Sequence, residues 1–147
     1  MNRSTITLLS TMLLGTGIAS SCKGDPVPSM EAKRIKITIG AKSFAATLAD
    51  NPTASAFKAL LPLRLKMSDL HGNEKFFHLP SPLPSADANP GNIQSGDLML
   101  WSSKSVVLFY KSFPTSYRYT RLGRIANPDG LAAAVGTGDV TIRFETE

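Results

Sequence analysis

Hydrophobic and polar side chains alternate over short stretches of the chain, with the period of two that is typical of β-strands. The pattern is clearest where Ile35, Ile37 and Ile39 alternate with Lys36 and Thr38. Further stretches with strand character occupy residues 44–48, 63–67, 74–79, 120–125 and 140–144. Because such a strand buries one face and exposes the other, the pattern predicts a sheet that encloses a single core.

The most hydrophobic part of the folded region consists of two runs, residues 96–101 and 105–110, on either side of a short polar turn. Two strand-like runs at this spacing predict a β-hairpin. Both runs are almost continuously apolar, which predicts that both faces of the hairpin are covered and that it lies at the centre of the sheet. Alternation along the first run puts Leu98 and Leu100 toward the interior and Trp101 on an outer, pocket-bearing face.

Asn-Pro pairs at residues 51–52 and 127–128 indicate where two short helices begin, because Asn caps a helix and Pro is tolerated in its first turn. The first helix is expected to bury Phe57 and Leu60 over an open barrel end, and the second to occupy residues 131–135. No strand–helix–strand units alternate along the chain, so a parallel sheet is not expected. The expected fold is mainly β: a closed antiparallel β-barrel of seven or eight strands, capped by two short α-helices.

Two longer segments carry no strand or helix pattern. Residues 80–95 contain four prolines and few large apolar side chains, and residues 111–119 follow the hairpin. Loops of this length are uncommon in compact domains unless they form lids or binding loops. In the second loop we expect Phe113, Tyr117 and Tyr119 to be exposed.

The first 21 residues have the features of a secretory signal peptide: Arg3 near the start, an uncharged apolar run, and small residues at the end. The apolar run is shorter than the ~20 residues that a membrane-spanning helix needs. Cys22, the only cysteine, follows at once. This junction resembles the lipobox of bacterial lipoproteins, in which the cysteine receives a diacylglyceryl group, although Ala19 replaces the usual leucine.

The resemblance implies a membrane-anchored lipoprotein of the bacterial cell envelope that faces the periplasm, with residues 1–21 as signal peptide, residues 22–33 as tether and residues 34–147 as the folded domain. The alternative is a chance cysteine beside an ordinary secretory cleavage site. A single cysteine excludes an intramolecular disulfide and a cysteine-rich zinc site. The two histidines, His71 and His78, lack the spacing of metal ligands, so we expect no metal and no cofactor.

Composition narrows the class of partner. The chain has 147 residues, of which 42% are hydrophobic and 18% are charged, which suits one globular domain with one core. Its net charge is +5, but the basic residues are scattered and form no stripe with interleaved aromatic residues. We therefore expect a solvated basic surface and no nucleic-acid partner.

Several segments resemble cyclophilins. The helix that begins at residue 52 is similar to their "P-K-T-x-x-N-F-x-x-L" helix, the two runs of the hairpin to their "G-x-x-S-M-A" and "S-Q-F-F-I" strands, and the segment LGRI at residues 122–125 to their "F-G-K-V" strand. A bacterial group of cyclophilin-like proteins of uncharacterised function resembles the chain more closely, at residues 67–75, 96–101 and 119–125. The resemblance extends over nearly all of residues 34–147 and implies a closed cyclophilin-like barrel.

The resemblance does not extend to the catalytic segment of cyclophilins. Their prolyl isomerase activity needs an arginine in an F-H-R segment followed by Q-G-G-D, and this arginine eases rotation about an amide bond whose barrier is ~18–20 kcal/mol. The corresponding residues 73–80 read NEKFFHLP, without arginine. We therefore carry over no catalytic residue and expect a binding module for a small ligand or an extended peptide. The alternative is a divergent peptidyl-prolyl isomerase that acts on envelope proteins.

Six residues on or beside the expected strands combine aromatic faces with polar groups, and such a set is suited to line a pocket at the barrel face. The set comprises Glu74, Phe76, Trp101, Tyr110, Tyr119 and Arg121. The planar fork of Arg121 is able to clamp a carboxylate. In the alternative interpretation, Trp101 and Tyr110 belong to the core, and Glu74 pairs with Arg121 for structural reasons.

Overall fold

The computed structural model describes residues 33–147. The predicted signal peptide at residues 1–21, the predicted lipidation site Cys22 and almost all of the tether at residues 22–33 lie outside the described residues. Within the described part, no helix has the length and hydrophobicity needed to cross a membrane.

The described residues form ten β-strands and two short α-helices. In chain order these are β1 (Arg34–Ile39), β2 (Lys42–Leu48), α1 (Pro52–Ala59), β3 (Leu63–Leu70), β4 (Glu74–His78), β5 (Asn92–Ile93), β6 (Asp97–Trp101), β7 (Ser105–Phe109), β8 (Phe113–Pro114), β9 (Thr120–Ile125), α2 (Leu131–Val135) and β10 (Val140–Thr146).

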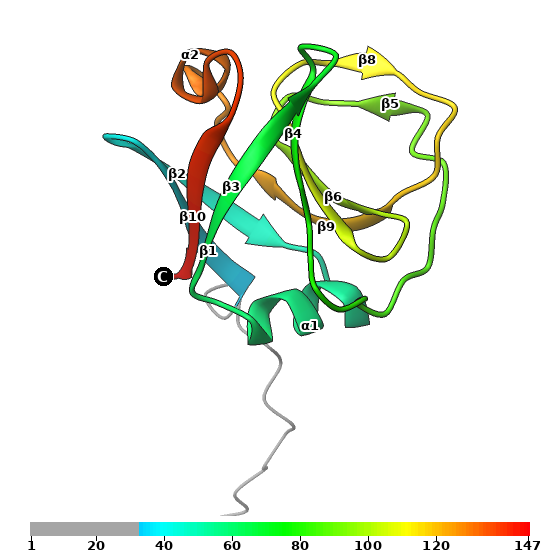
Figure 1. The fold of residues 1–147 in the computed structure, drawn as a ribbon. Coiled ribbons are helices and arrows are strands. Elements are labelled where there is room, and N and C mark those ends of the chain that lie inside the picture. Colours follow the sequence, from blue (N-terminus) through cyan, green and yellow to red (C-terminus); the bar gives the residue numbers. More distant parts are fainter. Residues whose placement is uncertain (1–32) are drawn as a thin grey trace, which may run out of the picture.

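Eight of these strands close into a barrel in the order β1-β10-β3-β4-β7-β6-β9-β2. Every neighbouring pair in the barrel is antiparallel. Figure 1 shows the barrel with α1 at one end and α2 at the other. The predicted fold, a mainly β closed barrel with two short helices, is therefore confirmed. Closure gives each barrel strand two hydrogen-bonded neighbours, which removes the open sheet edges.

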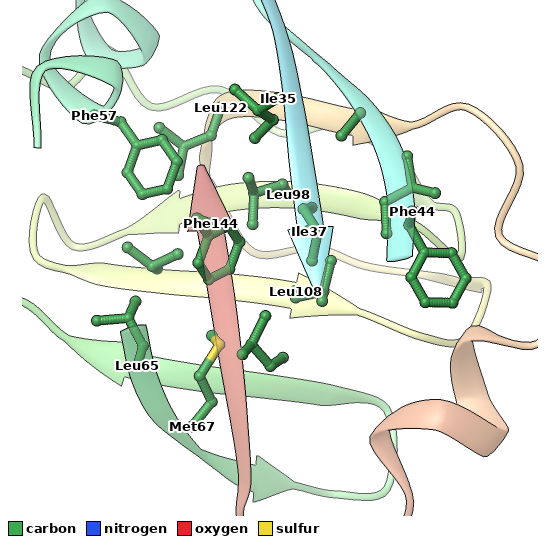
Figure 2. Packing of buried hydrophobic residues seen from close by; sticks show 14 of the residues in the cluster. Ile35, Ile37, Phe44, Phe57, Leu65, Met67, Leu98, Leu108, Leu122 and Phe144 are labelled. Atoms are coloured by element: carbon green, nitrogen blue, oxygen red, sulfur yellow. The ribbon is translucent and has the colours of Figure 1, made fainter. Parts of the chain in front are cut away.

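The barrel interior holds the main hydrophobic core, part of which is drawn in Figure 2. In the central hairpin, Leu98 and Leu100 of β6 are buried in this core. Met99 lies between them in the sequence and belongs to a second cluster on the outer face of the barrel. Trp101 is 45% exposed. The predicted assignment of faces in the first strand of the hairpin is therefore confirmed.

Helix α1 covers one end of the barrel. Asn51 caps it as predicted, because its Oδ1 accepts a hydrogen bond of 2.7 Å from the N–H of Ala54. The ring of Phe57 meets Phe144 of the barrel edge-on, with 5.7 Å between their centroids (Figure 2). The expected burial of Leu60 is wrong: this side chain is 43% exposed, because it follows the last helical turn as the C-cap residue.

A buried lysine ties the opposite end of the barrel together. Lys75 of β4 has no solvent exposure. Its Nζ donates hydrogen bonds to the carbonyl oxygens of Gly136, at 2.9 Å, and Gly138, at 2.7 Å. It also pairs with Oδ1 of Asp69 at 2.9 Å, so its three N–H groups are matched by three acceptors. The same Asp69 oxygen accepts a hydrogen bond of 2.6 Å from the hydroxyl of Tyr110.

Helix α2 occupies the predicted residues but begins differently from the Asn-Pro prediction. Its N-cap is Gly130, which has a φ of 81° and no side-chain cap. Asn127 instead accepts a hydrogen bond of 3.0 Å from the N–H of Asp129. The Asn-Pro pair thus forms a turn ahead of the helix, and glycine supplies the left-handed backbone conformation at the helix start.

The two long loops pair with each other beside the barrel. Strand β5 from the first loop and β8 from the second form a two-stranded antiparallel sheet (Figure 1). The expected exposure of Tyr119 is wrong: this side chain is 8% exposed, because its ring packs on Phe109 of β7. Phe113 is half-buried, whereas Tyr117 is 65% exposed, as expected.

Candidate ligand-binding site

A cavity of about 570 Å³ lies between the outer face of strands β4 and β7 and the segment that connects β8 to β9. We call it the outer-face cavity. Small-molecule sites commonly have volumes of ~300–1,000 Å³, so this cavity is large enough for a ligand. Its lining residues are Leu70, His71, Asn73, Glu74, Phe76, His78, Trp101, Ser105, Val107, Phe113, Pro114, Thr115, Ser116, Tyr117 and Tyr119.

The strand register arranges the cavity floor in rows across β4 and β7. The pairs are Glu74 with Phe109, Phe76 with Val107, and His78 with Ser105, and Trp101 of β6 lies opposite Ser105 on its other side. Alternate residues of a strand share a face, and each residue advances the strand by about 3.4 Å. Glu74 and His78 are therefore about 14 Å apart along the floor. The floor runs from a carboxyl group at one end to the exposed side chains of His78 and Trp101 at the other.

Aromatic contacts hold the β8–β9 segment against the barrel. Phe109 of β7 contacts Phe113 with 5.7 Å between ring centroids, and it contacts Tyr119 edge-on at 5.5 Å. Ile93 of β5 and Met99 of β6 belong to the same outer cluster. Aromatic pairs of this kind contribute about 0.5–1.5 kcal/mol each beyond their burial. The segment that forms one wall of the cavity is thus fixed on the side where it meets β7.

Exposed hydrophobic side chains gather around this cavity. Among the described residues, four large hydrophobic side chains are strongly exposed: Leu60, Leu70, Trp101 and Tyr117. The last three all line the outer-face cavity, and only Leu60, beside α1, lies elsewhere. Exposed apolar surface that is concentrated around a hollow is typical of a binding site rather than of a random surface.

The carboxyl group of Glu74 lies in an environment that disfavours its charge. Burial, with a smaller contribution from the negative charge of Asp69, raises the pKa of Glu74 from 4.5 to about 7. The ion pairs of the described residues do not include Glu74. Near neutral pH this carboxyl group is therefore present in both forms: protonated, it donates a hydrogen bond, and ionised, it attracts a cation.

Asp69 of β3 shows the opposite behaviour. Hydrogen bonds from Tyr110 and Lys75 lower the pKa of Asp69, so its carboxylate stays ionised. Burial and the hydrogen bond to Asp69 raise the pKa of Tyr110 to about 12. Burial, followed by the charge of Glu74, also raises the pKa of Tyr119. Two carboxyl groups on adjacent strands thus have pKa values that are shifted in opposite directions.

The far end of the floor carries a short polar contact. Nδ1 of His78 and Oγ of Ser105 are 2.6 Å apart, and the ring of His78 lies 5.2 Å from that of Phe76 between centroids. Among the described residues no carboxylate bonds to His78, so the pair lacks the orienting acid of a catalytic triad. No group of three His, Cys, Asp or Glu side chains within residues 33–147 is placed to hold a metal ion.

The six sequence-predicted residues do not all meet. Four of them line the outer-face cavity: Glu74, Phe76, Trp101 and Tyr119. Tyr110 does not, because alternation puts it on the same side as Leu108 in the interior core. Arg121 lines a second cavity of about 410 Å³ beside the start of α1, and its Nη1 is 3.6 Å from Asp97. The alternative that pairs Glu74 with Arg121 is therefore wrong, and so is its placement of Trp101 in the core.

Sequence reasoning missed the wall of the cavity and the charge behind its floor. Thr115 and Ser116 line the cavity, but their position depends on the pairing of two loops that are distant in sequence. Asp69 of β3 and Lys75 of β4 were missed because their ion pair depends on the register between the two strands. The sequence did contain a signal for His78 as a lining residue. It follows Glu74 and Phe76 at intervals of two, and alternate residues of a strand lie on one face.

Comparison with known proteins identifies the family. The solution structure of a hypothetical protein from Archaeoglobus fulgidus matches with a TM-score of 0.53 and 21% sequence identity, over 78% of this chain and 95% of that chain. At this identity the similarity shows a shared fold. A search of the curated proteins finds no match. The model of the Cyclophilin-like family matches residues 37–145, which include the whole outer-face cavity. The chain therefore belongs to the Cyclophilin-like family.

Proposed function

We propose that this protein is a non-catalytic binding module that holds a small ligand, or one side chain of an extended peptide, in the outer-face cavity. The observation that carries the proposal is the gathering of exposed Leu70, Trp101 and Tyr117 at a single hollow. A bound ligand would remove this apolar surface from water, which is favourable by about 25 cal/mol per Å². The module works at an envelope membrane, to which lipidated Cys22 tethers it.

Polar groups at both ends of the floor would orient the ligand. Glu74 lies at one end and the hydrogen-bonded pair of His78 and Ser105 at the other. A few polar groups in a mostly apolar hollow are the usual arrangement of a small-molecule site, because apolar contact supplies affinity and the polar groups supply orientation.

Amide NMR of the purified protein tests this proposal with a set of small aromatic fragments that includes neutral, cationic and anionic members. We expect fragment-induced shifts to cluster at residues 70–78, 101–107 and 113–119. Trp101→Ala should reduce the affinity of the responding fragments at least fivefold. Leu60→Ala removes a side chain of similar exposure outside the cavity and should leave these affinities unchanged. Shifts that cluster elsewhere, or a full set without response, would remove the basis of the proposal.

Prolyl isomerase activity on envelope proteins is the alternative function, and one observation favours it. Arg121 lines the second cavity together with Met99, so a guanidinium group and an apolar wall meet there. The carboxylate of Asp97 lies 3.6 Å from this guanidinium, which competes with its use on a prolyl amide.

We expect the protein to show no prolyl isomerisation above the spontaneous rate in a protease-coupled assay with a proline peptide. The physical reason is that the arginine that polarises the amide in cyclophilins has no counterpart in residues 73–80. The variant Arg121→Ala serves as the matched test. A rate well above the spontaneous one that disappears in this variant would favour the isomerase over the binding module.

A further inference from the structure

The charges at the outer-face cavity are opposite to the charge of the chain as a whole. The chain has a net charge of +5, yet its cavity is lined by neither lysine nor arginine. Glu74 is the only carboxyl group among the lining residues, and Asp69 adds its negative charge from β3. The cavity is thus an acidic site in a basic protein, and its local field favours positively charged ligands and disfavours anions.

Among the groups that line this cavity, the ionised carboxylate of Glu74 would gain most from a ligand of opposite charge. Partial burial removes water that would solvate its charge. Asp69 has Lys75 at 2.9 Å and the Tyr110 hydroxyl at 2.6 Å as partners. Within residues 33–147 no ion pair gives Glu74 a comparable cation. A cationic group on a ligand would supply that partner.

Aromatic rings form much of the remaining lining. They belong to Phe76, Phe113, Tyr117, Tyr119 and Trp101. The face of an aromatic ring attracts an ammonium group within about 6 Å, and Trp and Tyr do so more strongly than Phe. The rings of Phe76, Phe113 and Tyr119 are partly or fully buried, so the attraction there is stronger than on an open surface.

We infer that the outer-face cavity selects an organic cation, with an ammonium group at the Glu74 end and an apolar or aromatic body that extends over Val107 toward Trp101. This inference names the ligand class of the proposed binding function and rests on that function. The floor of about 14 Å gives room for such a body, and its central row, Phe76 and Val107, is apolar. An anionic ligand would face the carboxyl group of Glu74 in a cavity that is lined by neither lysine nor arginine.

Trp101 provides the readout, because it is the only tryptophan of the chain and lines the cavity. Its fluorescence is followed while the purified protein at pH 8 is titrated with benzyltrimethylammonium, benzyl alcohol or benzoate. These three probes share a ring and differ in charge. We expect the cation to bind at least tenfold more tightly than the alcohol, and benzoate to bind most weakly.

The pH dependence tests the role of Glu74. Benzyltrimethylammonium keeps its charge at every pH, so a change in affinity must come from the protein. We expect affinity to fall about 10- to 100-fold from pH 8 to pH 5, as Glu74 takes up a proton that the bound cation disfavours. Asp69, which is paired with Lys75, and Tyr110 face Glu74 from outside the lining. The other titratable groups that line the cavity are Tyr117, Tyr119, His71 and His78.

Matched variants separate these groups. Glu74→Gln should remove both the preference for the cation over benzyl alcohol and the pH dependence of cation affinity. The double variant His71→Gln with His78→Gln should retain the pH dependence. Trp101→Leu keeps apolar surface but removes the aromatic ring. Calorimetry should therefore show a larger loss of affinity for the cation than for the alcohol.

The outcomes distinguish this inference from the proposed function. Equal affinities for the three probes, or a cation preference that survives Glu74→Gln, would overturn cation selectivity while leaving a ligand-binding cavity in place. If none of the three probes binds while NMR maps other fragments to the cavity, only the inference would be overturned. Fragments that map outside the cavity would overturn both.

Discussion

Glu74 and Asp69 show how two carboxyl groups on adjacent strands acquire different properties from their surroundings. Asp69 accepts hydrogen bonds from Tyr110 and Lys75, which lower its pKa. Glu74 lies in the outer-face cavity without such donors, and burial raises its pKa to about 7. Shifted pKa values in a cavity are common at functional sites. At the scale of the residue, the difference in pKa depends on the surroundings of each carboxyl group: Asp69 has hydrogen-bond donors, whereas Glu74 is partly buried.

The raised pKa of Glu74 predicts a pH-dependent stability. The folded protein holds a proton on Glu74 up to about pH 7, whereas the unfolded chain releases it near the ordinary value of 4.5. The free energy of unfolding should therefore decrease as pH rises from about 5 to 8, by about 1–2 kcal/mol from this group, because solvent screens a carboxyl group that is only partly buried. Glu74→Gln should remove this component and be the more stable protein at pH 8.

Urea denaturation of both proteins at pH 5 and pH 8 measures the difference, and comparison of the two proteins cancels the contributions of the groups that they share. Asp129→Asn, which neutralises an exposed carboxylate far from the cavity in sequence, is the control. If Glu74→Gln leaves the pH dependence unchanged, the environment assigned to this carboxyl group is wrong.

Leu100 and Trp101 are sequence neighbours on opposite faces of β6. Leu100→Ala should reduce the free energy of unfolding by about 2–5 kcal/mol, because it leaves a hole in the interior core. Trp101→Ala should cost no more than about 1 kcal/mol, because the side chain is 45% exposed, and its main effect should be on ligand affinity. Denaturant melts of the two variants give both values. The reverse order would mean that the faces of β6 are inverted.

At the scale of the element, β4 serves two structures at once. Its outward residues, Glu74, Phe76 and His78, line the cavity. Lys75, between them, reaches Gly136 and Gly138 in the loop after α2. Strand β4 thus links the floor of the outer-face cavity to the closure of the barrel end. The network around Lys75 therefore also positions the strand that carries Glu74.

Removal of the Lys75 ammonium should destabilise the fold. Lys75→Met leaves the Asp69 carboxylate without its ion pair and two loop carbonyls without their donor, so we expect a loss of about 3–5 kcal/mol. Hydrogen exchange should also become faster in residues 131–138. Lys66→Met is the matched control on β3, since Lys66 is exposed and its carboxylate contact is 3.9 Å long. Similar stability of the two variants in urea melts would show that the network has no structural role.

At the scale of the whole molecule, the outer-face cavity lies outside the barrel core. The interior of the barrel is filled by the main hydrophobic cluster. The cavity lies instead between the outside of the barrel and the β8–β9 segment. A closed barrel is a rigid support, and loops on a rigid support commonly carry binding residues. The family match covers this whole arrangement at residues 37–145.

Membrane attachment is the prediction that concerns the whole chain. Cys22→Ala should move the protein from the membrane fraction to the soluble fraction, because lipid chains on this cysteine would provide the anchor. Cells that express each form are fractionated, and the pellet is extracted with detergent as a control for aggregation. A variant that remains in the membrane fraction and is released only by detergent would argue against anchoring through Cys22.

Local chemistry in the sequence was sufficient to predict most of the fold. Alternation over residues 35–39 and over the central hairpin predicted half-buried strands and the inward face of β6, because a strand places successive side chains on opposite sides whatever lies around it. The Asn51 cap was predictable for the same reason, since it bonds within its own helix. Glu74, Phe76 and Trp101, which were predicted to line a pocket, do line the outer-face cavity, because polar and aromatic side chains on an outward face form a local pattern.

Only the tertiary structure decided which of these residues meet. Arg121 lies at a second cavity and not at the outer-face cavity, because alternation within one strand does not determine which cavity an outward residue meets. The wall of the cavity depends on the pairing of Asn92 with Pro114. The raised pKa of Glu74 depends on burial and on Asp69 from another strand. These properties arise from contacts between residues distant in sequence, so they exist only once barrel closure and loop pairing have brought the segments together.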